Sequence, residues 1–147
     1  MLAHVFIPIY GVIKLEFKKV YYTWDRYQED LCTLADDLQF EPSVIVGIAR
    51  GGLVPAVQLS HILGKSLLSC HYQTRDGGRK ERIKIPEYAL IVDDINDTGK
   101  TLTGVTEKVE HDRFATLTLF NKSTSMFKVD YFAKDAKDDE WIVFPWE

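Results

Sequence analysis

The sequence predicts a single α/β domain in which helices flank a mainly parallel β-sheet. The chain has 147 residues, of which 46% are hydrophobic, so it is long enough to bury one core. Short β-branched segments of the kind that form fully buried strands alternate with helical patterns. Two of these strands are each followed by a glycine-bearing turn and a helix, which is typical of βαβ units.

The first predicted helix begins at Thr23, which can cap it, and ends near residue 40. Apolar side chains recur along it at steps of three and four. They are Trp24, Tyr27, Leu31, Leu34 and Leu38. This spacing places them on one side of the helix, which we expect to face the sheet.

A buried strand, a turn and a helix come next. Residues 43–48 are mostly β-branched and predict the strand, and residues 49–52 break it with two adjacent glycines. The following helix has Pro55 in its first turn, where proline is tolerated, and ends at Gly64, a common C-terminal residue.

The second half of the chain repeats this alternation. Strands are predicted at residues 67–71, 88–92, 115–121 and 129–133, with a last short apolar segment at 141–144. Residues 93–100 predict a polar turn, and residues 101–111 a helix. Ligands of parallel sheets bind beyond the carboxyl ends of the strands, where both glycine-bearing turns should lie.

Residues 1–17 form an N-terminal extension to which the sequence assigns no role, and residues 18–147 form the domain. The first 13 residues are apolar and nearly uncharged, which suits an added strand or an oligomer contact. They are fewer than the ~20 residues of a membrane helix and lack the features of a signal peptide. We therefore expect a cytoplasmic protein without a membrane partner.

Composition narrows the function classes further. The net charge of −4 argues against broad nucleic-acid binding, so we expect no nucleic-acid partner. The two cysteines, Cys32 and Cys70, are too few and too far apart for a disulfide framework or a zinc module. We expect both to be small buried thiols in a reducing compartment.

The most informative stretch is residues 89–101. A buried strand delivers Asp93 and Asp94 to its carboxyl end, Asp97 follows, and a Thr-Gly-Lys-Thr turn opens a helix. Free amides at such a turn, with a glycine that lets the backbone approach closely, suit a phosphate. Adjacent carboxylates can accept hydrogen bonds from the vicinal hydroxyls of a sugar. Together these features predict a site for a ribose phosphate.

Two other interpretations of this stretch are open. The Gly-Lys-Thr of residues 99–101 is found in nucleotide-binding P-loops, but that motif needs a glycine where Asp94 stands. A solvated acidic turn with Asp97 or Thr98 as a helix cap is the plainer alternative. A cap explains one of these residues, but it leaves unexplained two carboxylates at the end of a buried strand.

The stretch resembles the signature that binds 5-phosphoribosyl-1-pyrophosphate (PRPP) in type I phosphoribosyltransferases: a hydrophobic strand, two acidic residues and Asp-Thr-Gly-x-Thr. The resemblance spans most of the chain. Residues 22–25 resemble the start of bacterial xanthine–guanine and archaeal purine enzymes, and residues 47–56 resemble their pyrophosphate loop. Residues 141–147 resemble the purine-binding end, particularly the archaeal form. The resemblance implies the type I phosphoribosyltransferase fold for residues 18–147, with a small C-terminal hood that binds the base.

The resemblance implies roles in binding PRPP. Asp93 and Asp94 would hold the ribose hydroxyls, directly or through Mg²⁺, and so would be the residues nearest the metal. Arg50 and Gly51 would contact pyrophosphate, in a loop whose peptide is strained and can be cis. The 5′-phosphate would be bound by Asp97, Thr98, Gly99, Lys100 and Thr101.

It also implies roles in binding the base. Asp97 would face N7 of the purine and act as the catalytic base or proton acceptor. Lys122 would donate to the exocyclic O6. Trp141 would stack on the ring, and the backbone at Trp141 and Ile142 would contact the 2-position.

A basic loop at residues 75–84 surrounds a Gly-Gly hinge and could fold over pyrophosphate as a lid. Its basic residues are Arg75, Arg79, Lys80, Arg82 and Lys84. Arg79 is our first choice for a pyrophosphate contact, and a solvated turn is the alternative.

Plain structural interpretations are also open for three other side chains. Arg50 could be an ordinary surface arginine, and Lys122 an ordinary lysine at a strand end. Trp141, like Trp146, could be a core or interface aromatic, since tryptophan mostly buries apolar area. One residue departs from the pattern: many bacterial xanthine–guanine enzymes carry an acidic residue where this chain has Val143.

The resemblance therefore predicts an enzyme of purine salvage that transfers ribose 5-phosphate from PRPP to a 6-oxopurine (hypoxanthine, guanine or xanthine) and releases pyrophosphate, with Mg²⁺ as cofactor. Its partners would be PRPP and a purine base, and we expect a homo-oligomer, either a dimer or a tetramer. A transferase for orotate, uracil or adenine and a non-enzymatic PRPP-sensing regulator are the alternatives. Lys122 and the Trp-Ile end favour a 6-oxopurine over these other bases. Asp97, Arg50 and the basic loop favour an enzyme over a regulator.

Overall fold

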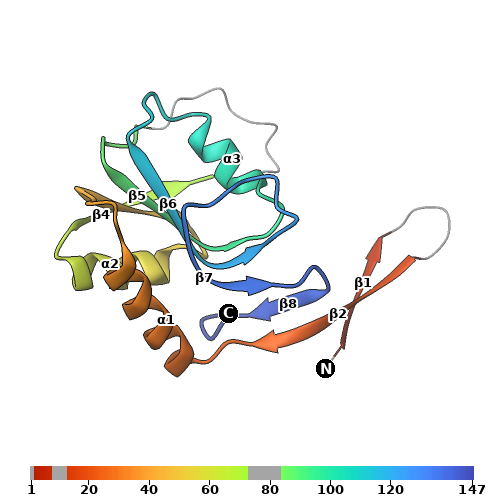
Figure 1. Cartoon of the computed structure of the whole chain (residues 1–147). Helices are drawn as coiled ribbons and strands as arrows, with labels where there is room; N and C mark the ends of the chain where they lie inside the picture. The colour runs from red at the N-terminus through yellow and green to blue at the C-terminus, as the bar shows by residue number, and fades with distance from the viewer. Residues whose placement is uncertain (1, 8–12, 73–83) are drawn as a thin grey trace.

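The computed structural model describes residues 2–7, 13–72 and 84–147, and it confirms the α/β class. The elements are β1 (Leu2–Ile7), β2 (Ile13–Tyr21), α1 (Trp24–Asp37), β3 (Val44–Ala49), α2 (Leu53–Leu63), β4 (Ser66–His71), β5 (Ala89–Asn96), α3 (Lys100–Thr106), β6 (Phe114–Lys122), β7 (Tyr131–Ala136) and β8 (Glu140–Val143). Helices and strands alternate from α1 to β6, as the sequence predicts (Figure 1).

Five strands form the main sheet in the order β4-β3-β5-β6-β7, and every neighbouring pair is parallel. The central strands are β3 and β5, in which Ile45 pairs with Leu90. Because these strands are parallel neighbours, the loops that follow them leave the same edge of the sheet. This arrangement brings the two glycine-bearing turns together.

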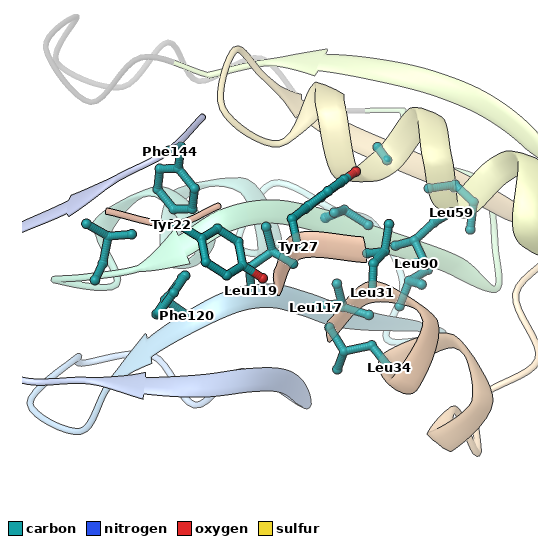
Figure 2. Packing of buried hydrophobic residues seen from close by; sticks show 14 of the residues in the cluster. Tyr22, Tyr27, Leu31, Leu34, Leu59, Leu90, Leu117, Leu119, Phe120 and Phe144 are labelled. Atoms are coloured by element: carbon teal, nitrogen blue, oxygen red, sulfur yellow. The ribbon is translucent and has the colours of Figure 1, made fainter. Parts of the chain in front are cut away.

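Two apolar clusters hold the sheet between its helices. On one face, Tyr27 and Leu31 of α1 pack with Leu90 of β5, all three without exposed area (Figure 2). On the other face, Leu102 of α3 packs against Ile91. Full burial of each such side chain contributes about 1.5–3 kcal/mol. Helices α1 and α2 therefore cover one face and α3 the other (Figure 1).

The helix termini follow the sequence closely. The Thr23 hydroxyl accepts a hydrogen bond from the Arg26 N–H at 3.2 Å and caps α1. Gly64 ends α2 in the left-handed conformation, with φ of 63°. Trp24 is half-exposed, unlike the other members of the predicted apolar stripe. Within the described residues, none of the helices has the length and apolar character needed to cross a membrane.

Strand β5 is longer than predicted. The sequence predicts the polar turn from residue 93, yet the strand continues to Asn96. Asp93 still pairs with Thr118 of β6. Asn96 pairs with Asn121 at the other end of the extension. The ladder to β6 therefore holds the acidic residues in extended backbone, and only residues 97–99 form the turn.

Helix α3 is shorter than predicted: it ends at Thr106, whereas the sequence predicts a helix to residue 111. The Thr106 hydroxyl donates back to the Leu102 carbonyl at 2.8 Å. Nε2 of His111 lies 2.7 Å from the Ile85 carbonyl oxygen. The Lys108 and Val109 N–H groups donate to carbonyls three residues back, at Val105 and Thr106, so the chain leaves the α-helical pattern after Thr106.

Strand β7 begins two residues later than the predicted strand at 129–133. The Asp130 carboxylate accepts hydrogen bonds from the N–H and hydroxyl of Thr116, at 2.8 and 2.9 Å. The Asp130 N–H in turn lies 3.1 Å from the Thr116 hydroxyl oxygen. These side-chain bonds replace the start of the ladder, which begins at Tyr131.

A second sheet contains β1, β2 and β8. β1 pairs with β2 antiparallel, and β2 pairs with β8 in parallel, Val20 lying opposite Ile142. The added strand predicted in the first 13 residues is confirmed for Leu2–Ile7, while an oligomer contact stays a prediction. β2 passes without a break through residue 17, and the division into an extension and a domain stays a prediction.

The two cysteines differ in exposure. Cys70 is buried, as expected, and burial raises the pKa of its thiol. The same expectation is wrong for Cys32, which is exposed. Cys32 follows Leu31 on α1, and one helical residue is a rotation of about 100°, which carries its side chain away from the core.

Candidate active site

Two adjacent carboxylates lie at the carboxyl end of β5. Asp93 is 8% exposed, and its carboxylate accepts a hydrogen bond from the Asp94 N–H at 2.9 Å. Burial, and after it the charge of Asp94, raises the pKa of Asp93 well above its usual range. Burial also raises the pKa of Asp94, and the charge of Glu147 adds to this effect. Ionisation of both carboxylates is therefore unfavourable in this buried position. Hydrogen-bond donors such as sugar hydroxyls, or a bound cation, would stabilise the charged forms.

The loop between β3 and α2 packs directly against this pair. A side chain at Gly51 would overlap the Asp94 carboxylate, so glycine is needed for this close approach. The Ala49–Arg50 peptide is cis, as the resemblance implies, and Arg50 is exposed. A cavity of about 780 Å³ opens beside the loop. Its lining residues are Arg50, Gly51, Leu53, Val54, Asp94, Trp146 and Glu147.

The predicted phosphate-binding residues 97–101 run continuously from the end of β5 into the first turn of α3. Gly99 has φ of 88°, a conformation that favours glycine. The Thr98 hydroxyl lies 3.4 Å from the Lys100 N–H, and both side chains are exposed. Thr101 is half-buried at the start of α3. The turn therefore exposes Thr98 and Lys100 on either side of Gly99, which is buried against residues 125–127.

Lys122 ends β6 beside this turn. Its side chain is only 8% exposed, and Nζ lies 3.2 Å from Oδ1 of Asp97. The Asp97 side chain is 57% exposed, so the ion pair joins a buried lysine to a solvent-exposed aspartate. A lysine is rarely this buried without a partner, and Lys122 therefore differs from an ordinary lysine at a strand end.

A smaller cavity, of about 180 Å³, lies between this ion pair and β8. Its lining residues are Phe17, Asp94, Ile95, Asp97, Lys122, Glu140, Trp141, Ile142, Phe144 and Glu147. It brings together predicted site residues from β5, β6 and β8. It shares Asp94 and Glu147 with the larger cavity, so the two cavities meet at the carboxylates.

The two C-terminal tryptophans have different environments. Trp141 is 49% exposed, and its ring lies edge-on to Phe17 with centroids 6.2 Å apart. Trp146 packs against the core, stacked on Phe144 with centroids 4.9 Å apart. Of the two, Trp141 is the one that lines the smaller cavity.

The sequence assigns no individual role to five cavity residues: Phe17, Ile95, Glu140, Phe144 and Glu147. Two of them, Phe144 and Glu147, lie within residues 141–147, which resemble the purine-binding end. The sequence could have pointed to Ile95, because it lies inside the acidic motif. No local pattern could have pointed to Phe17, because its place in the cavity depends on the pairing of β2 with β8 from the other end of the chain.

The basic loop is largely outside the described residues, and Arg79 with it. Lys84 is its one described basic residue, and it is exposed. The role of Arg79 stays a prediction.

The acidic pair is the natural place for a metal. Within residues 2–7, 13–72 and 84–147, no three His, Cys, Asp or Glu side chains are grouped to hold an ion. Asp93 and Asp94 offer only oxygen donors, which suit Mg²⁺. Mg²⁺ is usually bound through one or two carboxylates together with water and substrate phosphates, so this pair fits it.

A family model described as a phosphoribosyl transferase domain matches residues 24–147. The chain belongs to the phosphoribosyltransferase family. This phosphoribosyltransferase is a glycosyltransferase enzyme, and the family generally depends on Mg²⁺.

Similar proteins include purine enzymes. A xanthine-guanine phosphoribosyltransferase of Idiomarina loihiensis is 33% identical in an alignment of 114 residues that covers 70% of each chain. The crystal structure of a purine phosphoribosyltransferase from Pyrococcus horikoshii Ot3 is 38% identical and has a TM-score of 0.75, covering 88% of this phosphoribosyltransferase and 94% of that chain. A Helicobacter pylori xanthine-guanine-hypoxanthine phosphoribosyltransferase has the same TM-score and coverage at 26% identity.

Proposed function

We propose that this enzyme transfers ribose 5-phosphate from PRPP to a 6-oxopurine and releases pyrophosphate. The observation that carries this proposal is the 180 Å³ cavity, in which Asp97, Lys122 and Trp141 meet. It joins the larger cavity at Asp94. A base in the smaller cavity and pyrophosphate in the larger would therefore lie on either side of a ribose held at the carboxylates.

PRPP binding is assigned to three stretches. The carboxylates of Asp93 and Asp94 accept hydrogen bonds from the ribose hydroxyls, directly or through Mg²⁺. Residues 97–101 hold the 5′-phosphate through backbone amides, the threonine hydroxyls and Lys100. Arg50 and the Gly51 backbone contact pyrophosphate, with Arg79 as a further cation. The adjacency of Gly51 to Asp94 supports this division.

Base binding is assigned to Lys122, Asp97 and β8. Lys122 donates to the O6 carbonyl, and on adenine the same ammonium would face an amino group, which is also a donor. The carboxylate of Asp97 accepts from the N7 side of the ring. Trp141 stacks on the purine, and the backbone around Ile142 contacts its 2-position. The 3.2 Å ion pair supports this choice because it places a donor and an acceptor side by side.

The reaction forms a bond from the purine nitrogen to C1 of the ribose and breaks the bond from C1 to pyrophosphate. Arg50 stabilises the negative charge of the departing group. Asp93 and Asp94 lie near C1, where positive charge builds in the transition state. Asp97 accepts a proton from the base or stabilises the positive charge that develops on it. Bound Mg²⁺ would supply further charge stabilisation on the phosphates. Holding both substrates in line makes the displacement a local event.

A panel of bases tests this function. We expect Mg²⁺-dependent pyrophosphate release from PRPP with hypoxanthine, guanine or xanthine, and little with adenine, uracil or orotate. Activity restricted to the second group would overturn the base assignment and leave PRPP binding intact. PRPP binding without turnover on any base would favour a PRPP-sensing regulator instead.

A further inference from the structure

Asn96 is a buried polar residue between the acidic pair and the phosphate-binding turn. It is the last residue of β5 and is 1% exposed. A buried amide is costly unless its donors and acceptor are bonded. Asn96 therefore needs hydrogen-bond partners for both its amide nitrogen and its amide oxygen.

The structure supplies those partners from β6 and from the loop that follows. Nδ2 of Asn96 donates to the Asn121 side-chain oxygen at 2.9 Å and to the Phe127 carbonyl at 2.8 Å. Its Oδ1 accepts from the Ser125 hydroxyl at 2.8 Å. One side chain thus ties the end of β5 to the end of β6 and to residues 123–127.

The same loop lies against the turn at residues 97–101. The Met126 N–H donates to the Thr98 carbonyl at 3.0 Å. A β-carbon placed on Gly99 would lie 2.6 Å from both the Ser125 hydroxyl and the Phe127 nitrogen. The turn therefore rests on residues 125–127, and Asn96 holds those residues in place.

We propose that Asn96 is a positioning residue for PRPP: it fixes residues 123–127 so that the turn keeps its donors directed at the 5′-phosphate. This inference rests on the proposed function. Asn96 acts through Ser125, Met126 and Phe127 and has no contact with substrate of its own. Its loss should therefore weaken PRPP binding more than base binding or the chemical step.

The test compares Asn96→Leu with a control from another buried polar network in the same sheet. Thr116→Val removes a hydroxyl that bonds Asp130, in a network away from both cavities. If the whole cost of the groups left unpaired falls on PRPP binding, it corresponds to about a 5- to 150-fold change in affinity. We expect Asn96→Leu to raise the KM for PRPP within this range, with the KM for the base changing less than about threefold. Thr116→Val should leave both within about twofold, even at an equal loss of Tm.

Ser125→Ala gives a second, milder variant: it removes one partner of Asn96 and the hydroxyl that accepts from the Phe127 N–H at 3.2 Å. It should raise the KM for PRPP in the same direction by a smaller factor. Its effect should be smaller when Asn96→Leu is already present, because the two residues belong to one hydrogen-bond network. If Asn96→Leu does not fold, Ser125→Ala alone decides, and an unchanged KM for PRPP overturns the inference.

The parent enzyme is measured first, so that two failures are distinguished. No transfer from PRPP by the parent would overturn the proposed function and this inference with it. Transfer by the parent, with Asn96→Leu behaving like Thr116→Val, would overturn this inference alone.

Discussion

At the residue scale, Asp97 and Lys122 form one ion pair but are expected to serve different steps. Replacing Asp97 with asparagine keeps the shape of the side chain and removes its ability to take a proton. We expect Asp97→Asn to lower kcat by about 10²- to 10⁴-fold. The KM for PRPP should change little, because the backbone amides of the turn remain. Steady-state kinetics check this, and an equal loss of PRPP affinity and turnover would contradict a role in proton transfer.

Lys122→Ala should show the opposite pattern. Loss of the buried donor leaves the base carbonyl unpaired, which costs about 1–3 kcal/mol. The KM for a 6-oxopurine should rise about 5- to 150-fold, while the KM for PRPP stays nearly unchanged. Lys122→Met, which keeps most of the side-chain volume, separates lost charge from lost packing. Unaltered affinity for the base in both variants would remove Lys122 from the base site.

The acidic pair predicts a conflict between stability and function. Because the folded pKa of Asp93 is raised, the unfolded chain loses this proton at a lower pH than the folded one. The folded state then holds more protons, so stability falls as pH rises from the unfolded pKa through the folded one. We expect Asp93→Asn to raise Tm by about 2–6 °C at pH 7.5 in Mg²⁺-free buffer. The gain should disappear in acid.

Thermal unfolding between pH 4.5 and 8 measures this difference. Asp112→Asn, at an exposed aspartate, is the matched control. A gain for Asp93→Asn that is equal at all pH values would mean that packing, rather than charge, sets the effect.

At the scale of elements, the small sheet joins the two ends of the chain at the base cavity. β2 brings Phe17 against Trp141 of β8. An aromatic pair contributes about 0.5–1.5 kcal/mol, so Phe17→Ala should raise the KM for the base about 2- to 12-fold. The KM for PRPP should stay within about twofold.

Phe132→Ala is the control for this change, because Phe132 is a 39% exposed phenylalanine on β7 that lines neither cavity. Equal effects of the two substitutions on base affinity would show that Phe17 acts only through general stability.

The elements show what local sequence could and could not predict. Strands β3 and β6 and helix α2 follow from β-branched runs, glycine stops and apolar spacing, and they appear nearly where expected. The boundaries of β5 and β7 depend on partners far along the chain. Asp130 is the clearest example, because its bonds to Thr116 delay the strand and could not be inferred from its neighbours.

At the scale of the whole molecule, the α/β class followed from the alternation of elements, and the parallel sheet confirms it. The candidate site, whose roles stay predictions, could be proposed from the sequence where its residues are contiguous, as at residues 93–101. The part of the candidate site near Lys122 and Trp141 was harder to predict, because its cavity forms only where β6 and β8 come together in the folded chain. The small C-terminal hood, the homo-oligomer and the cytoplasmic location stay predictions.

Identification of the product tests the central claim most directly. The purified protein is incubated with PRPP, Mg²⁺ and guanine or hypoxanthine, and the products are resolved by mass spectrometry. We expect a purine ribonucleoside 5′-monophosphate and pyrophosphate in equal amounts, with formation of the nucleotide strongly reduced in Asp97→Asn. Consumption of PRPP without any nucleotide, or a nucleotide formed only from a base that lacks the 6-oxo group, would contradict it.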